Sequence, residues 1–331
     1  MRNRFSLPFL VGCILLIGSS VLTSCNLFKP KVDERDFAVS DTAAIQKIFI
    51  ADKGTRTIEL VRKNASVWTV NGKYPARPDA IRILLETIKE IRVNRPVPMN
   101  GHNAVIKDMA ANAIKVAIFT GDKDPIRTYY IGGVAKDYNG NYFLMEGAEH
   151  PFVVEIPGFD GFVSVRYILD ELDWRNRTIM AYEPSDLHSV KVQYFDERAN
   201  ESFELLAPDL NHYQLVPEAP VNEKKCAALF ESFRNLNAIN YARHRPQDEE
   251  ARKKPPFAEL TVTANNGQVR KIALIHADAT DRTKQQFDPN GKPMSFDSEI
   301  YYAWVDNNAD FLLIQDFMLR NILLNHKDFV K

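Results

Sequence analysis

The sequence predicts an α+β fold built from two tandem copies, each an antiparallel sheet with helices packed on one face. Short runs of alternating apolar residues are joined by turn sequences such as Asp52-Lys53-Gly54 and Asn265-Asn266-Gly267, which favour hairpins over parallel crossovers. The order strands, helix, strands, helix occurs twice along the chain. Matching apolar positions also recur at a slowly growing spacing, which indicates an internal duplication with short insertions in the second copy.

The first copy is expected over residues 41–180. Its predicted strands share a two-residue alternation of apolar and polar side chains; they are Ile45–Ile50, Thr57–Val61, Ser66–Val70, Ile114–Phe119 and Asn141–Leu144. Pro78 is expected to open a helix, because its missing N–H costs little in a first turn. The apolar stripe of that helix is Ile81, Leu84, Leu85, Ile88 and Ile91. A second helix is predicted around Phe162, Val165, Leu169 and Leu172.

The second copy is expected over residues 181–331. Its predicted strands are Leu187–Tyr194, Phe203–Leu206, His212–Val216, Phe257–Thr263 and the run Ile300-Tyr301-Tyr302-Ala303. A helix is predicted over Val221–Leu236, and another around Phe311, Ile314, Met318 and Ile322. The largest insertion relative to the first copy is expected between His276 and Asp297, where Asp288-Pro289-Asn290-Gly291 is a turn signal.

The predicted register between the copies rests on apolar positions. Ile48 is matched with Val190, Trp68 with Tyr213 and Val116 with Leu260. Further on, Asn141-Tyr142-Phe143-Leu144 is matched with Ile300-Tyr301-Tyr302-Ala303, and the helix at Phe162 with the one at Phe311.

The amino terminus resembles a bacterial lipoprotein signal. Arg2 and Arg4 precede an apolar stretch, Phe5 to Leu22, and the small residues of Leu22-Thr23-Ser24 end at Cys25. We therefore expect residues 1–24 to be removed and Cys25 to carry a diacylglycerol on sulfur and an acyl chain, such as palmitate, on nitrogen. The alternative is an uncleaved transmembrane anchor, in which Cys25 has no role.

Residues 25–40 lack apolar periodicity and are expected to form a tether of at most about 50 Å. In the lipoproteins that this segment resembles, Asp after the acylated cysteine favours retention in the inner membrane. Asn26 stands there, so the expected location is the outer membrane, facing the periplasm.

The charge and the cysteine content exclude several classes of protein. The 331-residue chain has a net charge of −1, which becomes −3 once Arg2 and Arg4 leave with the signal, so nucleic acid is not an expected partner. Of three cysteines, only Cys226 would remain as a free thiol, which forbids an internal disulfide. Cys226 shares a helical stripe with Leu229, Phe230 and Phe233, so a buried, inert thiol is expected.

No motif predicts catalytic, cofactor-binding or metal-binding residues. The chain has no zinc signature, P-loop, dinucleotide fingerprint or nucleophile elbow. Gly132-Gly133 is interpreted as a hairpin turn rather than a phosphate loop. Asp278, Asp281, Asp288 and Asp297 do not have the spacing of a calcium loop, so a solvated insertion is preferred.

Two further groups of residues have structural and functional interpretations. The basic runs Arg243-His244-Arg245 and Arg252-Lys253-Lys254 flank Asp248-Glu249-Glu250 and are expected in a solvated loop with internal ion pairs. Sugar stacking is one interpretation of Trp68, Trp174 and Trp304, but their apolar surroundings favour packing in the core.

Several segments resemble lipoproteins that carry the domain of unknown function DUF4340. They are Tyr74-Pro75-Ala76-Arg77-Pro78-Asp79, Ile91-Arg92-Val93, Arg95-Pro96-Val97, Tyr129-Tyr130-Ile131-Gly132-Gly133, Phe152-Val153-Val154 and Asp173-Trp174-Arg175-Asn176-Arg177. The resemblance covers most of the first copy and the second only loosely. It implies an architecture and a neighbourhood, the bacterial envelope, in some cases beside ABC-transporter components related to gliding motility. No activity is established for that family.

Two functional hypotheses remain from the sequence. The preferred one is a non-catalytic envelope lipoprotein that acts as a binding or assembly subunit, with membrane attachment through its lipid and with envelope proteins, such as an ABC transporter or gliding-type complex, as partners. Its partner-facing surface is expected near Tyr182 to Leu187, where the copies would meet. The alternative is an envelope hydrolase of glycan or peptide that uses two carboxylates brought together by folding.

Overall fold

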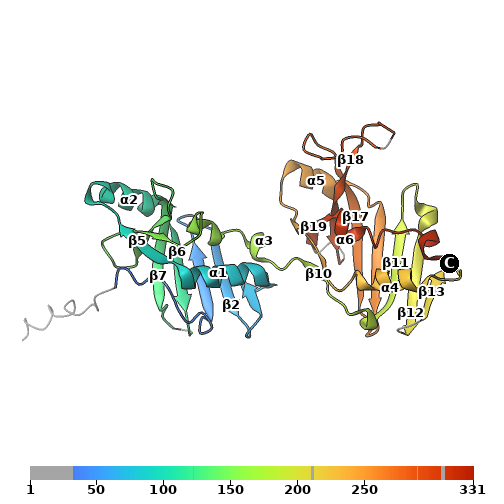
Figure 1. Cartoon of the computed structure of the whole chain (residues 1–331), viewed down its shortest axis with the longest axis horizontal. Helices are drawn as coiled ribbons and strands as arrows, with labels where there is room; N and C mark the ends of the chain where they lie inside the picture. Colours follow the sequence, from blue (N-terminus) through green and yellow to red (C-terminus); the bar gives the residue numbers. More distant parts are fainter. Residues whose placement is uncertain (1–32, 122, 210–211, 289, 307–309) are drawn as a thin grey trace, which may run out of the picture.

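The computed structural model describes residues 33–331, except for 122, 210–211, 289 and 307–309. Each of two repeats contains one large antiparallel sheet, and the repeats lie end to end (Figure 1). The predicted α+β class is therefore confirmed. Cys25 and the tether before Asp33 lie outside the described residues.

The first repeat contains a nine-stranded sheet in the order β4-β3-β2-β1-β6-β7-β8-β9-β5. Its strands are β1 (Lys47–Ala51), β2 (Thr57–Arg62), β3 (Trp68–Val70), β4 (Tyr74–Pro75), β5 (Arg92–Pro96), β6 (Ile114–Phe119), β7 (Arg127–Val134), β8 (Asn141–Met145) and β9 (Phe152–Glu155). Its helical segments are α1 (Pro78–Glu90), α2 (Met99–Asn112) and the 3-10 turn η1 (Val163–Arg166). The segment α3 (Glu171–Trp174) leads out of this repeat.

The second repeat contains an eight-stranded sheet in the order β13-β12-β11-β16-β17-β18-β19-β15. Its strands are β11 (Leu187–Tyr194), β12 (Phe203–Asp209), β13 (His212–Val216), β15 (Asn240–Tyr241), β16 (Ala258–Ala264), β17 (Val269–Asp278), β18 (Phe296–Val305) and β19 (Asp310–Gln315). Its helical segments are η2 (Pro184–Asp186), η3 (Ala199–Glu201), α4 (Glu223–Glu231), α5 (Pro246–Lys253), α6 (Asp316–Leu319) and η4 (His326–Phe329). A separate pair, β10 (Thr178–Met180) and β14 (Leu236–Asn237), lies where the repeats join.

The two sheets have the same topology, and strand pairing establishes the residue equivalences. Ile48 pairs with Leu60 and Ile118, whereas Val190 pairs with Leu205 and Val262. Each central strand therefore has equivalent neighbours on both sides, and the matches of Ile48 with Val190 and of Val116 with Leu260 are confirmed. Only β4 has no counterpart in the second sheet.

The predicted register fails by one residue at β8. Tyr129 pairs with Met145, and its counterpart Ile272 pairs with Val305. Tyr142 is therefore equivalent to Tyr302 rather than to Tyr301. The preceding connection occupies residues 135–140 in the first repeat and residues 279–295 in the second, so the predicted insertion is confirmed.

Helices cover both faces of each sheet, and not one face alone as the sequence predicts. The packed stripe of α1, with Leu84 and Ile88 fully buried, closes the main core of the first repeat, and α4 does the same in the second. The helices α2 and α5 occupy the opposite faces, against β7 and β17. In β17, Leu274 belongs to the main core and its neighbour Ile275 to a second cluster beneath α5, as alternation in a strand requires.

Gly132-Gly133 lies inside β7 rather than in a hairpin turn, so that prediction was wrong. A Cβ on Gly132 would lie 2.6 Å from Cγ of the buried Met109, which belongs to α2. The glycine is thus needed where a helix rests directly on the strand. The turn itself follows later and contains Gly140, whose φ is +89°.

Three helix predictions require correction. The segment predicted around Phe162 forms only the short pieces η1 and α3, and the one around Phe311 is strand β19 followed by α6. The register match of Phe162 with Phe311 is consequently wrong. The helix predicted over Val221–Leu236 ends at Glu231, although Phe233 and Leu236 beyond it are buried.

The beginning of the described chain is packed onto the first repeat. Phe37 is 1% exposed and its ring makes edge contacts with those of Tyr129, Phe143 and Phe152. The amide of Val39 donates to the carbonyl of Ile88 at 3.1 Å. Residues 33–39 therefore belong to the folded repeat, near the end of the sheet that carries β8, β9 and β5, opposite to β4. The tether predicted over residues 25–40 is thus wrong for residues 33–39.

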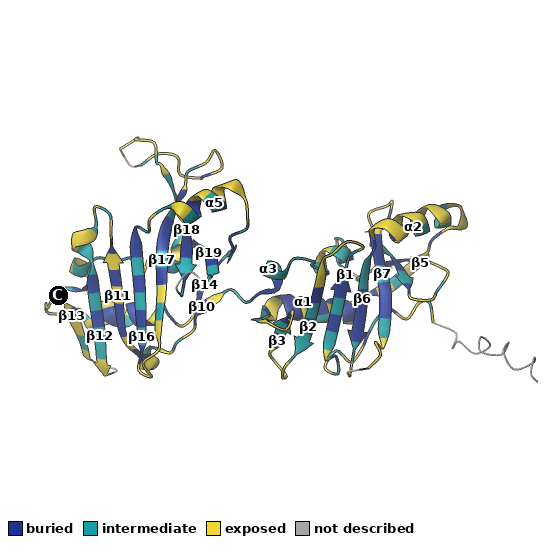
Figure 2. Cartoon of the chain, turned by 180° about the vertical axis from the view of Figure 1, so that it is seen from behind, coloured by how far each residue is buried: buried dark blue, intermediate teal, exposed yellow. Residues whose placement is uncertain are grey.

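The described part of the chain contains no helix with the length and apolar character needed to cross a bilayer. Buried residues instead concentrate in the strands of both sheets, whereas α2 and the insertion beside β18 are largely exposed (Figure 2).

Candidate functional site at the junction of the repeats

The connector, residues 175–178, leads from the first repeat to the second. It is hydrogen-bonded first to one repeat and then to the other. Arg175 forms a backbone bridge with Ala76, and the amide of Arg77 donates to the carbonyl of Trp174 at 2.7 Å. Three residues after Arg175, Thr178 pairs with Asn237. The chain therefore passes from one repeat to the other with almost no free backbone between them.

The guanidinium of Arg175 lies between two aromatic rings from different repeats. Its central carbon is 3.7 Å from the ring centroid of Tyr74 and 4.2 Å from that of Tyr241. Nη2 is 2.6 Å from Oδ1 of Asp310, at the start of β19. Arg175 is 9% exposed. Because a desolvated cation binds aromatic faces more strongly than an exposed one, this stack joins the repeats.

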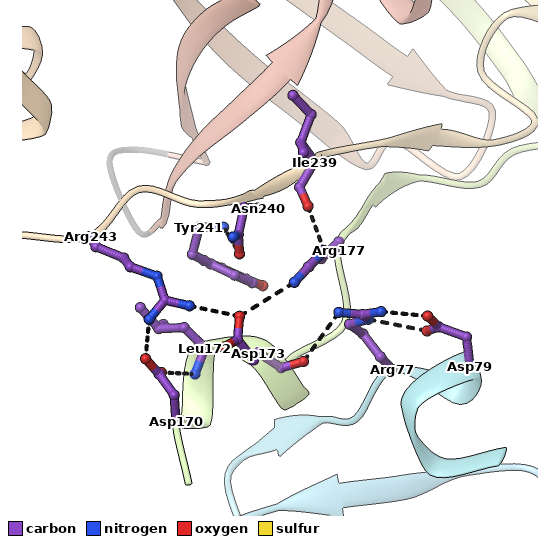
Figure 3. Close-up of polar contacts among 10 residues, drawn as sticks. All are labelled: Arg77, Asp79, Asp170, Leu172, Asp173, Arg177, Ile239, Asn240, Tyr241 and Arg243. Atoms are coloured by element: carbon purple, nitrogen blue, oxygen red, sulfur yellow. Dashed lines mark hydrogen bonds and ion pairs between the residues drawn. The ribbon is translucent and has the colours of Figure 1, made fainter. Parts of the chain in front are cut away.

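Asp173 links two further arginines (Figure 3). Its Oδ1 lies 2.7 Å from Nη2 of Arg243, in the second repeat, and 3.6 Å from Nη2 of Arg177, in the connector. Arg243 also forms an ion pair with Asp170, whose carboxylate accepts the amide of Leu172 at 2.9 Å and so caps α3. The short helix α3 thereby presents two carboxylates to the second repeat.

Arg77 extends the cluster to the start of α1. Its Nη1 donates to the carbonyl of Asp173 at 3.3 Å, and its Nε donates to Asp79 at 3.1 Å. On the other side, Nη1 of Arg177 donates to the carbonyl of Ile239 at 2.6 Å, and the hydroxyl of Tyr241 donates to the carbonyl of Asn176 at 2.6 Å. We call these charged residues the junction cluster: Arg77, Asp79, Asp170, Asp173, Arg175, Arg177, Arg243 and Asp310.

The charges of the junction cluster shift pKa values in the directions expected for paired groups. The hydrogen bond from Arg77 lowers the pKa of Asp79, and the hydrogen bond to Asp173 raises the pKa of Arg243. Burial, followed by repulsion from Arg77, lowers the pKa of Arg177. Burial likewise raises the pKa of the Tyr241 hydroxyl.

Four arginines therefore face four aspartates at the junction, so the charges balance. Such a cluster is suited to fixing the relative orientation of two folded units, because several of its contacts are directional and partly shielded from water. The lowered pKa of Asp79 favours its ionised form, which is the opposite of what a general acid requires.

The predicted interface near Tyr182 to Leu187 lies beyond the residues that join the repeats. The amide of Tyr182 donates to the carbonyl of Phe233 at 2.9 Å, and Nδ2 of Asn265 donates to the carbonyl of Ser185 at 2.7 Å. These contacts attach the segment to the second repeat alone. The copies therefore meet at Arg175 to Thr178, several residues before the predicted segment.

The other sequence candidates lie apart from the junction, with one exception. Trp68 and Trp174 are 3% and 0% exposed in the first core, so their assignment to core packing is confirmed, whereas Trp304 is half-buried against Phe311. Trp174 also takes part in the junction, because its carbonyl accepts the amide of Arg77. Cys226 is fully buried, and burial raises the pKa of its thiol to about 11.

The basic and acidic runs of the second repeat form a helix rather than the predicted loop. Within α5 and its flanks, the expected internal ion pairs are present: Arg245 with Asp248, Lys253 with Glu250, and His244 and Arg252 with Glu249. Asp248 is fully buried and accepts the hydroxyl of Tyr302 at 2.7 Å.

Two of the aspartates considered for calcium have other partners. Asp278 pairs with Lys254, and Asp297 accepts the hydroxyl of Thr283. Within the described ranges, no three His, Cys, Asp or Glu side chains are grouped as metal ligands.

A profile of the domain of unknown function DUF4340 matches residues 67–256, which is more than half of the chain. The chain belongs to the DUF4340 family. The match runs from β3 to just past α5 and so contains both sides of the junction except Asp310. No curated protein and no solved structure matches this DUF4340 protein.

Two of the segments that carried the resemblance meet at the junction of this DUF4340 protein. Tyr74 to Asp79 lies against Asp173 to Arg177 through the bridge between Ala76 and Arg175. In the sequence these two segments are separate features, the start of one helix and the end of another. Their contact with Tyr241, Arg243 and Asp310 had no local sequence signal, because it depends on residues 65 or more positions away.

Proposed function

We propose that this DUF4340 protein is a lipid-anchored envelope protein that acts as a non-catalytic binding or assembly subunit of an envelope or transporter-associated machine. The lipid would be attached at Cys25, in the outer membrane and facing the periplasm. The observation that carries the proposal is the position at which the described chain begins, at Asp33, relative to the second repeat.

The described chain begins at the end of the first sheet that is remote from the junction. Phe37 packs against β8 and β9, whereas the second repeat is joined at β4, on the opposite edge (Figure 1). From Cys25 to Phe37 the chain can extend over at most about 40 Å. A lipid at Cys25 would thus hold the first repeat near the membrane and direct the second repeat away from it.

The junction cluster supports the same proposal. Two repeats on a flexible linker would sample many orientations, whereas the stack of Arg175 between Tyr74 and Tyr241 restricts them to one. A fixed, elongated arrangement presents distant surfaces to a partner with little loss of entropy on binding.

The hydrolase alternative would need a carboxyl group whose pKa is raised, so that it is protonated near neutral pH. Among the described residues, Asp52, Asp79, Asp137, Glu146 and Asp248 have shifted pKa values, and in each case the shift is downward. Arginine, lysine or tyrosine donors cause these shifts. This pattern favours a binding role over acid catalysis.

The anchoring part of the proposal is tested by metabolic labelling with palmitate in the native host. Cys25→Ala should abolish incorporation and leave the precursor uncut, whereas the matched variant Cys13→Ala should label normally. Label entering Cys25→Ala at the wild-type level would refute the anchor.

The binding part is tested by crosslinking in intact cells, followed by purification from membranes. A discrete heterologous partner should be recovered with the wild-type chain and depleted with Cys25→Ala, because the unanchored protein is mislocalised. Turnover of glycan or peptide substrates that disappears on changing one Asp or Glu would instead establish the hydrolase.

A further inference from the structure

The second repeat carries a long connection that its sheet does not require. Residues 279–295 join β17 to β18, whereas residues 135–140 join the matching strands β7 and β8. The order of the strands on either side of these connections is the same in both sheets. Because the first repeat closes the same hairpin with the shorter turn, the additional residues are free for another role. We call the described part of the longer connection, residues 279–288 and 290–295, the arm.

The arm is a hairpin whose two sides are hydrogen-bonded to each other. Near the sheet, the amide of Ala279 donates to the carbonyl of Ser295 at 3.2 Å, and further out the amide of Met294 donates to the carbonyl of Gln286 at 2.9 Å. Nε2 of Gln286 also donates to the carbonyl of Thr280 at 2.9 Å. The arm therefore has a defined shape of its own, as compact functional loops do.

A buried threonine closes the middle of the arm. Thr283 is 6% exposed, and its Oγ1 accepts the amide of Thr280 at 2.9 Å and donates to Oδ2 of Asp297 at 3.2 Å. Because a buried hydroxyl is costly unless it is hydrogen-bonded, these contacts favour a single conformation of the arm.

The base of the arm is fixed to the sheet and to α5. The ring of His276 in β17 is stacked between those of Phe257 and Phe296, with centroid distances of 3.9 and 4.2 Å. Asp278, the last residue of β17, forms an ion pair with Lys254, which follows α5. With its base held in this way, the arm projects from the second repeat beyond α5 (Figure 1).

The tip of the arm exposes an aromatic side chain and a basic one. Phe287 is 57% exposed, although its backbone forms a bridge with Pro293 on the other side of the hairpin. Asp288 closes the turn, because its Oδ1 accepts the amides of Asn290 and Lys292 at 2.9 and 2.8 Å. The charge of Asp288 is thus used within the turn. The exposed side chain of Lys292 forms no ion pair with another described residue.

This tip has the chemistry of a binding anchor. Aromatic side chains are enriched at protein–protein interfaces, and a side chain on a fixed support loses little entropy when it binds. Lys292, next to Pro293, favours a partner surface that carries a carboxylate. Two arms that met across a twofold axis would bring their Lys292 side chains together, so a second copy of this chain is the less favourable occupant.

We propose that the arm inserts Phe287 into an apolar pocket of a heterologous envelope protein, with a carboxylate of that protein facing Lys292. The proposal rests on the binding role proposed above and assigns the partner's contact to the arm. The arm belongs to the repeat that an anchor at Cys25 would hold away from the membrane, where a partner has access to it.

The first test places a photoreactive phenylalanine at position 287 of the full chain in the native host. The same residue at Phe317, which is 53% exposed in the same repeat, is the matched control. Position 287 should give one adduct with a heterologous protein, and position 317 should give none. Lys292→Glu in the same chain should reduce this adduct by about fivefold or more, whereas Lys292→Arg should keep it.

The second test replaces residues 279–295 by the shorter turn 135–140, with Asn in place of Tyr138, because that tyrosine is itself 73% exposed and has a positive φ. The variant should unfold within about 3 °C of the wild type. Crosslinking in cells should recover the partner about fivefold less, or lower still, than with the wild type. If the variant unfolds earlier, Phe287→Ser decides, with Phe317→Ser as its control, since both positions are exposed.

Each outcome bears on the arm or on the binding role. A heterologous adduct at position 287 that depends on Lys292 supports the proposal. An adduct to a second copy of this chain, or one that Lys292→Glu leaves unchanged, overturns it. Full recovery of a partner by the shortened chain or by Phe287→Ser overturns the arm assignment but keeps the binding role. No partner from the wild type at any surface removes both.

Discussion

Trp174 and Phe329 occupy the same place in the two repeats, 155 residues apart. The carbonyl of Trp174 accepts the amide of Arg77 at 2.7 Å, and the carbonyl of Phe329 accepts the amide of Asn222 at 2.7 Å. Both side chains are 0% exposed and close the core of their repeat. The duplication therefore extends to the last turn of each repeat, and the function of the following residue differs: Arg175 enters the junction, whereas Val330 does not.

The first prediction concerns the independence of the two cores. Phe329→Ala should destabilise the second repeat by about 3–5 kcal/mol, the usual cost of emptying a buried phenylalanine site. Cys226 reports the effect, because its buried thiol becomes reactive only when the second core opens. In a chain starting at residue 26, which has this single thiol, labelling by a maleimide should accelerate strongly.

The control for that experiment is Trp174→Ala, which empties the matching place in the first core. Labelling of Cys226 should stay slow in this variant while intrinsic fluorescence reports loss of structure in the first repeat. Equal acceleration in both variants would mean that the two repeats unfold as one unit.

The second prediction concerns the junction. Arg175→Lys retains the charge but loses the planar group that stacks between Tyr74 and Tyr241. We expect a loss of about 1–2 kcal/mol, given a partly shielded ion pair and two cation–aromatic contacts. Small-angle scattering should show a broader distribution of dimensions, and trypsin should cleave faster at Arg177.

Arg56→Lys provides the matched control, since its ion pair with Asp52 is exposed and lies far from the junction. It should change stability by less than about 0.5 kcal/mol and leave the scattering profile unaltered. An unchanged profile for Arg175→Lys would show that other contacts alone orient the repeats.

The sequence predicted the strands better than the helices, for a physical reason. Strands such as β1 and β11 are buried mainly on one face, so their apolar residues alternate visibly. In β19 both faces are covered, with Phe311 under α5 and Leu312 in the main core, so the run Phe-Leu-Leu-Ile shows no alternation. Such a run cannot be distinguished from a buried helix by periodicity alone.

The sequence pattern does not predict the helices α2 and α5, for the opposite reason. In α2 only Met109 is buried, and in α5 only Asp248 and Ala251, so neither helix carries a stripe of large apolar residues. The junction cluster could not be predicted from the sequence either, because ion pairs such as that of Arg175 with Asp310 join residues 135 positions apart. Local sequence patterns predict the two repeats but not the surfaces through which the repeats contact each other.

The third prediction concerns the contact between α2 and β7. Gly132→Ala would place a Cβ 2.6 Å from Cγ of Met109, so the helix must shift or the methionine must change rotamer. We expect a loss of about 1–3 kcal/mol, as for overpacking elsewhere, measured by urea unfolding. Met109→Ala in the same chain should recover part of it.

Gly133→Ala is the control for this position, because its nearest neighbour, Oδ2 of Asp108, would be 3.6 Å away. It should leave stability within about 0.5 kcal/mol of the wild type. If the two alanine variants were equally destabilised, the cause would be the flexibility of the strand rather than the contact with the helix.

The fourth prediction concerns a histidine in the second repeat. The ring of His276 is stacked between those of Phe257 and Phe296, with centroid distances of 3.9 and 4.2 Å. Burial is the main cause that lowers the pKa of His276. Asp196 and Glu197 raise this pKa by a smaller amount, and Lys254 and Arg198 lower it further. The folded protein therefore prefers the neutral imidazole.

Because the folded protein prefers the neutral imidazole, the free energy of unfolding depends on pH. Below a pH of about 6.5 the unfolded chain binds a proton at His276 that the folded chain does not, so the free energy of unfolding falls as the pH falls, by at most about 1.4 kcal/mol per pH unit. His276→Phe keeps the aromatic stack and should remove this part of the loss between pH 7.5 and pH 5, as measured by urea unfolding. His188→Gln, on the exposed side of β11, should retain the wild-type slope. Parallel curves for the wild type and His276→Phe would show that the stacked ring accepts a proton as readily as one in the unfolded chain.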